Sequence, residues 1–117
     1  MINSAQKLAR LSECRNQHGA VIASGNRVLG RGTNTYKTHA TYGGGPLKTL
    51  HAEAAAIRDA KRRGISLHGK DLYVARVNCD NKLSRPCASC ASLIKREGIR
   101  KVYYTDANGE VVSEYPS

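Results

Sequence analysis

The chain has 117 residues, of which 40% are hydrophobic and 24% charged, and its formal net charge is +10. This composition, without any low-complexity tract, is typical of a folded protein and excludes a disordered chain. The length fits one compact domain, so we expect residues 1–117 to form a single domain. Phe and Trp are absent, and the core must therefore be built from Ile, Leu, Val, Ala and some Tyr.

Charge and cysteine content bear on location and partners. No stretch approaches the roughly 18 apolar residues of a membrane span, and the first residues lack the apolar run of a signal peptide. We therefore expect a cytoplasmic protein without a membrane partner, whose four Cys are metal ligands or buried thiols. The excess of 19 Lys and Arg over 9 Asp and Glu attracts phosphate, which leaves both nucleotides and nucleic acid open as partners.

Hydrophobic periodicity and turn residues predict an alternation of helices and strands. In chain order we expect a helix over 4–14, a hairpin with strands over 19–23 and 27–32, a long polar loop over 33–50, a helix over 52–63, a strand over 71–77, a helix over 87–97, and strands over 100–105 and 111–112. About half a dozen residues join the last two strands, which must therefore run antiparallel. The pattern predicts an α/β fold, with helices on the faces of a sheet.

Two segments at predicted helix starts carry the residues of a metal site: His51-Ala52-Glu53, and Pro86 followed by Cys87-Ala88-Ser89-Cys90. Cys87 and Cys90 lie three residues apart, so on a helix their sulfurs share one face, and the positive end of the helix dipole favours thiolate. Two thiolates and one imidazole suit Zn²⁺. Three protein ligands leave a fourth position for water, which indicates a catalytic rather than a structural site.

Glu53 follows His51 by two residues, in the same helical turn, and so lies beside the metal without binding it. Zinc lowers the pKa of its bound water toward neutrality. Hydrolytic removal of an amine also needs a group that takes the water proton, protonates a ring nitrogen and protonates the leaving amine, and a carboxylate can do all three. Cys-x-x-Cys alone also fits a redox pair or half a zinc ribbon, but the two segments together match the zinc deaminase signature.

From Gly19 to Tyr103 the chain resembles the cytidine and deoxycytidylate deaminase superfamily, which includes tRNA adenosine, guanine and polynucleotide cytosine deaminases. The resemblance implies three α/β/α layers with a five-stranded mixed sheet, and a metal held between two helix starts. Asn34 matches an Asn that in many members touches the sugar or base, although from sequence it could equally turn the chain. The implied roles are zinc ligands for His51, Cys87 and Cys90, a proton shuttle for Glu53, and substrate contacts for Asn34 and Ala52.

The subgroup is less well defined. With His at position 51, the chain resembles the deoxycytidylate, tRNA-adenosine and guanine members of the superfamily. With its antiparallel terminal hairpin, it resembles instead the nucleoside deaminases and some bacterial DNA-targeting toxins. We expect deamination of cytosine in a free (deoxy)cytidine nucleoside or nucleotide, because the chain is small and lacks a nucleic-acid module. The alternatives are deamination of cytosine or adenine in single-stranded DNA or RNA, and a zinc-stabilised binding protein without turnover.

A homo-oligomer is compatible with the small core. The basic residues that a nucleic-acid face would use are Lys61, Arg62, Arg63, Lys95, Arg96, Arg100 and Lys101, although helix dipoles also favour cations at such helix ends.

Overall fold

The computed structural model of the chain describes residues 2–11, 17–25, 27–37, 48–50, 52–77 and 88–115. Its elements in chain order are α1 (Ile2–Ala9), β1 (Gln17–Ser24), β2 (Arg27–Thr33), β3 (Thr35–Lys37), β4 (Lys48–Leu50), α2 (Ala52–Arg62), β5 (Asp71–Val77), α3 (Ala88–Arg96), β6 (Lys101–Thr105) and β7 (Val111–Glu114). Among these described elements, no helix has both the length and the apolar character needed to cross a membrane.

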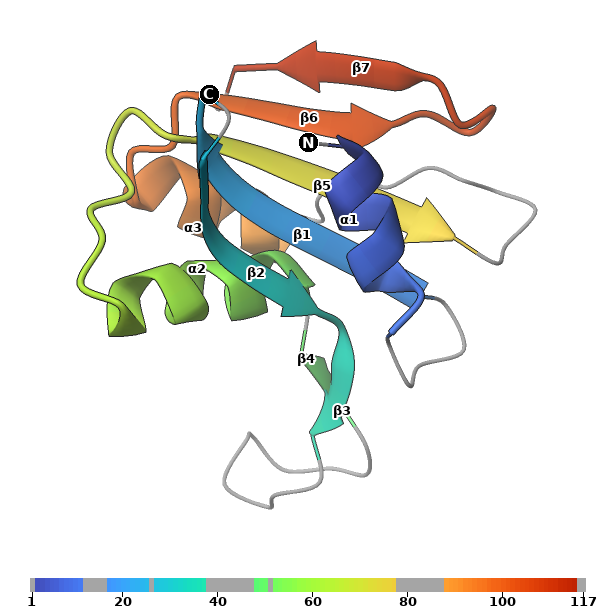
Figure 1. Cartoon of the computed structure of the whole chain (residues 1–117), viewed down its shortest axis with the longest axis horizontal. Coiled ribbons are helices and arrows are strands. Elements are labelled where there is room, and N and C mark those ends of the chain that lie inside the picture. Colours follow the sequence, from blue (N-terminus) through green and yellow to red (C-terminus); the bar gives the residue numbers. More distant parts are fainter. Residues whose placement is uncertain are drawn as a thin grey trace.

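Five strands form one mixed sheet in the order β2-β1-β5-β6-β7. β1 runs antiparallel to β2 and β5, β5 runs parallel to β6, and β7 returns antiparallel to β6. Figure 1 shows α1 on one face of this sheet and α2 and α3 on the other. These observations confirm the predicted α/β fold of three layers, its five-stranded mixed sheet and the antiparallel pairing of its last two strands.

The sheet separates two clusters of buried side chains. The larger cluster, between the sheet and the α2–α3 layer, contains Ile22 and Leu72, and the smaller one, beneath α1, contains Val21 and Ala75. Neighbouring residues of β1 thus belong to different clusters, because successive side chains of a strand point to opposite faces. Both clusters are built from Ala, Val, Leu and Ile, with Tyr only at their margins, as the absence of Phe and Trp predicts.

Helix α2 lies directly on strand β2 because the facing residues are small. A Cβ atom added at Gly32 would lie 2.7 Å from the carbonyl oxygen of Ala52 and would also clash with the backbone nitrogen of Ala56. At Gly30 an added Cβ would lie 2.8 Å from the carbonyl oxygen of Ala56 and 2.9 Å from the Cβ of Ala60. The part of α2 that contacts β2 therefore consists of alanines, namely Ala52, Ala55, Ala56 and Ala60, and this contact fixes where α2 begins.

The ends of the helices follow local hydrogen bonding. At the end of α2 the Ile65 N–H donates to the Ala60 carbonyl and the Gly64 N–H to the Lys61 carbonyl, each at 3.0 Å, with Gly64 at a φ of 76°. This is the glycine helix end expected at position 64. The expectation of a first helix over 4–14 was wrong in its bounds: α1 ends at Ala9, and Leu11 is 76% exposed in the following turn.

The long polar segment over 33–50, expected to be a loop, has a short strand near each of its ends. β3 and β4 pair antiparallel, with Thr35 opposite Leu50 and Lys37 opposite Lys48, in a two-stranded sheet of their own. Three-residue strands show too little alternation for a period of two to be recognised. Residues 38–47 lie outside the described part of the chain.

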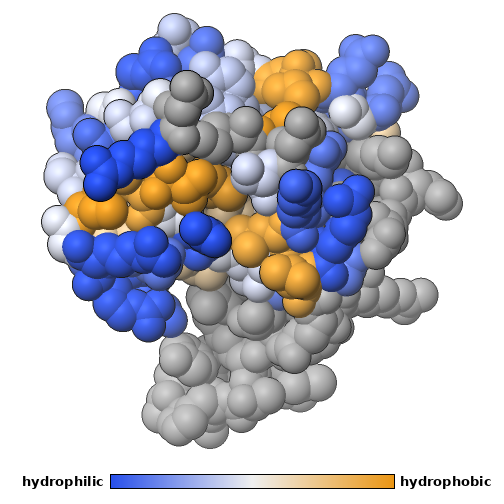
Figure 2. All heavy atoms as spheres, in the orientation of Figure 1, coloured by the Kyte–Doolittle hydropathy of each residue, from blue (hydrophilic) through white to orange (hydrophobic). Residues whose placement is uncertain are grey.

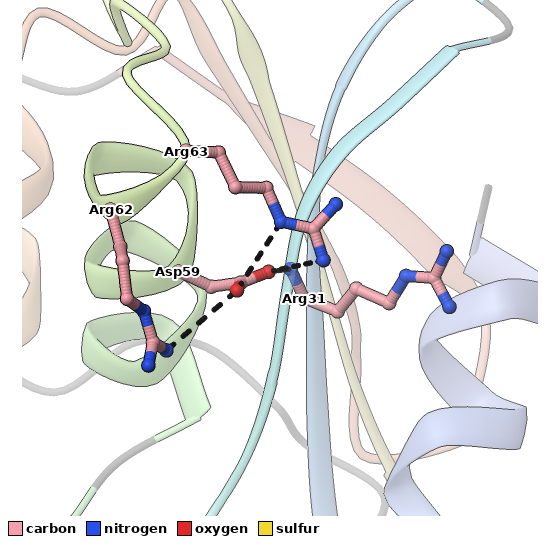
Figure 3. A network of polar contacts seen from close by, with 4 residues as sticks. All are labelled: Arg31, Asp59, Arg62 and Arg63. Carbon is pink, nitrogen blue, oxygen red and sulfur yellow. Dashed lines mark hydrogen bonds and ion pairs between the residues drawn. The ribbon is translucent and has the colours of Figure 1, made fainter.

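A single carboxylate joins α2 to the outer strand β2. Asp59 accepts a hydrogen bond from the backbone N–H of Arg31 at 3.0 Å and forms ion pairs with Arg62 at 3.8 Å and Arg63 at 3.2 Å. Figure 3 shows Asp59 between the side chains of Arg62 and Arg63 and next to Arg31 of strand β2. The Asp59 carboxylate thus accepts a hydrogen bond from a backbone N–H of this outer strand. This bond fixes the second half of α2 against β2.

We expect Gly32→Ala to destabilise the fold, because the added methyl group has to displace the backbone of α2. Overpacking of this kind costs about 1–3 kcal/mol in free energy of unfolding, measured by urea denaturation. Gly25→Asn is the matched control: nothing lies within 4 Å of an added Cβ there, and the φ is +59°. Asn tolerates that backbone conformation, so the control should cost less than about 1 kcal/mol. Equal stability of Gly32→Ala and the unaltered chain would contradict the close contact.

Candidate active site

The starts of α2 and α3 lie at the same edge of the sheet. Gly32 of β2 faces Ala52 and Gly30 faces Ala60, so α2 runs antiparallel to β2 and begins where that strand ends. α3 connects the parallel strands β5 and β6, and therefore begins where β5 ends. β2 and β5 both run antiparallel to β1, so their final residues lie at one edge. Figure 1 shows the two helices side by side on this face.

Glu53 lies in the first turn of α2 and is 5% exposed. A carboxylate in the first helical turn is stabilised by the positive end of the helix dipole. Its burial is the unusual feature, because Glu is rarely withdrawn from water without a specific role or partner. The structure therefore confirms the predicted helical position of Glu53 and adds that its side chain is enclosed.

Cys90 lies in the first turn of α3, is also 5% exposed, and forms no disulfide. His51 and Cys87, the other two predicted zinc ligands, lie outside the described residues. Among the residues that are described, no three His, Cys, Asp or Glu side chains form a group able to hold a metal ion. Cys90 is the one predicted ligand within that part, so the ligand set stays a prediction.

Asn34 has a clear structural role at the corner between β2 and β3. Its Oδ1 accepts a hydrogen bond from the backbone N–H of His18 at 2.8 Å, and its own N–H donates to the His18 carbonyl at 3.3 Å. The paired register of β1 and β2 ends one residue earlier, at Gly19 and Thr33. The side-chain oxygen thus replaces the backbone carbonyl that regular pairing would supply, and the chain can leave the sheet toward β3.

Ala52, the other predicted substrate contact, is fully buried beside Gly32 in the cluster beneath α2. Its side chain packs against the sheet, so any contact with a substrate would come from its backbone. As the first residue of α2 it carries one of the N–H groups that have no acceptor within the helix.

Two further polar residues at this edge were not among the predicted site residues. Arg76 near the end of β5 pairs with His18 near the start of β1, and both are half-buried. Arg76 lies two and four residues after Val74 and Leu72, which belong to the cluster beneath α2 and α3, so it occupies the same face of the sheet. In the sequence, Leu72, Val74 and Arg76 alternate along the predicted strand. This alternation could have placed Arg76 on the buried face.

Four of the basic residues near the far ends of α2 and α3 are paired with carboxylates. Lys61 contacts Glu97 at 2.6 Å, Arg62 and Arg63 contact Asp59, and Arg100 contacts Asp71 at 3.0 Å. Arg62 is nine residues beyond Glu53, roughly 13 Å along the helix axis. These pairs lie at the opposite end of the helices from Glu53 and Cys90 and favour the interpretation of Lys and Arg as residues that stabilise helix ends.

Two groups at that opposite end have shifted pKa values. Burial raises the pKa of Tyr73, as do the neighbouring Tyr103 and Asp71, while Arg100 acts in the other direction. The hydrogen bond and charge of Asp71 raise the pKa of Arg100. Tyr73 stacks on Tyr103 with ring centroids 4.5 Å apart. These interactions join the starts of β5 and β6 and contribute nothing to the edge where Glu53 lies.

An open groove of about 320 Å³ lies on the other face of the sheet, where Leu8 of α1 faces Val21 and Val28. Figure 2 shows this side of the molecule, with apolar side chains bordered by hydrophilic ones. Glu53 and Cys90 belong to the helices of the opposite layer, so the groove is separate from the candidate site.

Comparisons with known proteins agree with this geometry. Residues 1–106 match the family model described as the cytidine and deoxycytidylate deaminase zinc-binding region. Among curated proteins, the chain is 35% identical over 106 residues to an uncharacterized deaminase in the luxG 3′ region of Aliivibrio fischeri. That alignment covers 85% of this chain, which spans 65% of the length of the relative.

Two solved structures are similar in fold. The crystal structure of dCMP deaminase from the cyanophage S-TIM5 in complex with dCMP and dUMP matches with a TM-score of 0.68 and 24% identity, over 89% of this chain and 76% of that one. Cytidine deaminase from Burkholderia pseudomallei matches with a TM-score of 0.76 and 17% identity, over 98% of this chain and 89% of that one. At these identities the likeness shows a common fold.

We expect Asn34→Ala to lower stability, because it removes the acceptor of the partly buried hydrogen bond from the His18 N–H. Leaving such a donor unsatisfied costs about 1–3 kcal/mol in free energy of unfolding, measured by urea denaturation. Asn34→Asp keeps an oxygen at this position and should lose less. If Asn34 served only to bind substrate, both variants would be as stable as the unaltered chain.

Proposed function

Because the chain belongs to the cytidine and deoxycytidylate deaminase family, we propose that it hydrolyses the amine of cytosine in a free (deoxy)cytidine nucleoside or nucleotide, giving the uracil product and ammonia. The observation that carries this proposal is the burial of Glu53 and Cys90 in the first turns of two helices that start at one edge of the sheet. A buried carboxylic acid and a buried thiol have little value for packing, and both groups are used in metal-assisted hydrolysis.

Zinc is the cofactor that we assign to His51, Cys87 and Cys90. The described member of this set fits the ion: Cys90 is a buried cysteine in the first turn of α3, where the helix dipole favours thiolate. When bound, zinc supplies the Lewis acidity that lets water act as a nucleophile near neutral pH.

Glu53 performs the proton transfers in this proposal. Its carboxylate takes a proton from the attacking water as the water oxygen bonds to C4 of cytosine, and delivers that proton to N3. It then takes the second proton of the former water and passes it to the amine. The C4–N bond breaks as the C4=O bond forms, and ammonia leaves. Enclosure of Glu53 protects this carboxylate from exchange with bulk water.

A free substrate agrees better with the described charges than a polynucleotide does. Four of the basic residues that a nucleic-acid face would use, namely Lys61, Arg62, Arg63 and Arg100, form ion pairs within the chain. Those pairs reduce the positive field that such a face would present to phosphates. Single-stranded DNA and RNA are therefore included in the assay as the alternative substrates.

We expect Glu53→Gln to lower the rate of deamination by about 10²–10⁴-fold, because Gln cannot take or deliver the proton. The zinc-loaded protein is incubated with cytosine, adenine and guanine nucleosides and nucleotides, and with single-stranded DNA and RNA, and products are read by mass spectrometry. Glu97→Gln, which alters a carboxylate paired with Lys61 at the end of α3, is the matched control and should keep full activity. Turnover confined to polynucleotide, or unchanged in Glu53→Gln, contradicts the proposal.

A second expected outcome concerns the metal. The protein should bind about one zinc ion per chain, and Cys90→Ser should lose most of it together with part of its thermal stability. Zinc is measured by atomic emission on dialysed protein, and stability by thermal denaturation with and without a chelator. Ser92→Ala alters an exposed residue of the same helix and should retain the metal. Full zinc content in Cys90→Ser would remove Cys90 from the ligand set.

A further inference from the structure

Three polar residues from adjacent strands form a row at the edge of the sheet where α2 and α3 start. In the pairing of β1 with β5, His18 lies opposite Arg76. On the other side of β1, Asn34 follows the last paired residue of β2 and is hydrogen bonded to His18. The row Asn34–His18–Arg76 therefore crosses β2, β1 and β5 in neighbouring positions, and paired residues of antiparallel strands have Cβ atoms about 5 Å apart.

This row is next to the candidate site. The preceding row across the same strands is Gly32–Ala20–Val74, and the first residue of α2 packs on Gly32. Because α2 runs antiparallel to β2, the row containing Arg76 lies beyond the N-terminal end of the helix. His18 and Arg76 share the face of Ala20 and Val74, which belong to the cluster beneath α2 and α3. The row thus lies at the end of the sheet where α2 begins, the helix that carries Glu53 in its first turn.

Arg76 adds a guanidinium group to this row. A guanidinium is a cation that can bind phosphate oxygens with two parallel hydrogen bonds. The Arg76 side chain is half-buried and its Nε is fully buried, so its field is screened less than that of a solvated cation. The N-termini of α2 and α3, which start at the same edge of the sheet, add positive potential. Lys61, Arg63 and Arg100 act at the other end of the fold.

We propose that Arg76 binds the phosphate of the substrate and makes the enzyme specific for a cytosine nucleoside monophosphate over the nucleoside. This inference rests on the proposed function and names the substrate class within it. A phosphate ester is also present in a polynucleotide, so the assay must distinguish a free monophosphate from an internal phosphate. Arg76 is then a specificity residue, and its loss should weaken binding of the phosphorylated substrate while the chemistry at the base proceeds.

The test compares kcat and KM for dCMP, deoxycytidine and a cytosine within a short single-stranded oligonucleotide. The unaltered enzyme should favour dCMP over deoxycytidine by about 100-fold in kcat/KM, the scale expected for a buried charge contact with phosphate. Arg76→Gln should lose most of that preference through a raised KM for dCMP, with kcat/KM for deoxycytidine changed less than about threefold. Arg76→Lys, which keeps the charge but not the paired hydrogen bonds, should lie between the two.

Two controls separate this role from a structural one. Arg100→Gln removes an arginine at the opposite end of β5 and should leave the ratio of dCMP to deoxycytidine unchanged. Glu53→Gln provides a protein that binds substrate without turning it over, so calorimetric affinities for dCMP and deoxycytidine can be compared with and without Arg76→Gln. Tighter binding of dCMP that disappears with Arg76→Gln supports the inference even where turnover is slow.

Other results overturn the inference. Equal kcat/KM for dCMP and deoxycytidine in the unaltered enzyme refutes it and leaves the proposed deamination intact, as does an equal loss for both substrates in Arg76→Gln. Activity confined to the oligonucleotide refutes it in favour of an internal phosphate. Absence of turnover on every cytosine compound refutes the proposed function. In that case, equal calorimetric affinities of Glu53→Gln for dCMP and deoxycytidine also refute the role of Arg76.

Discussion

The contact between the alanine face of α2 and the glycines of β2 determines most of the geometry described above. Ala52, Ala56 and Ala60 can approach the backbone of β2 only because Gly30 and Gly32 carry no side chain. Close approach fixes both the height of the helix above the sheet and the point at which it begins. The position of Glu53, one residue into that helix, follows from this packing.

Much of the fold could be predicted because its signals are local. The strand Asp71–Val77 has the predicted bounds, since a run of apolar residues there is flanked by polar and turn-forming ones. The final hairpin follows from its turn, where the Asp106 side chain accepts hydrogen bonds from Asn108 and Glu110 and Gly109 adopts a φ of 88°. Pairing that depends on distant partners was missed: neither Thr35–Lys37 nor Lys48–Leu50 has a pattern that indicates a strand by itself.

The candidate site divides in the same way. Spacing within a helical turn was enough to predict the positions of Glu53 and Cys90, and the structure adds their burial. The sequence alone could not decide between a substrate contact and a structural role for Asn34. Its hydrogen bond to His18 depends on the register of two strands. Arg76 was overlooked for a related reason. Its significance comes from the strand beside it and the helix above it, neither of which is near it in sequence.

The antiparallel pairing of β1 with β5 also has a consequence for how the chain acquires its fold. β1 receives its first partner, β2, through a turn of a few residues, but its second partner begins at Asp71. During synthesis the chain would therefore present one side of an apolar central strand as an open edge until β5 has emerged, which favours association with other unfinished chains. Because a pairing so distant in sequence slows folding, closure of this edge is expected to set the rate at which the sheet forms.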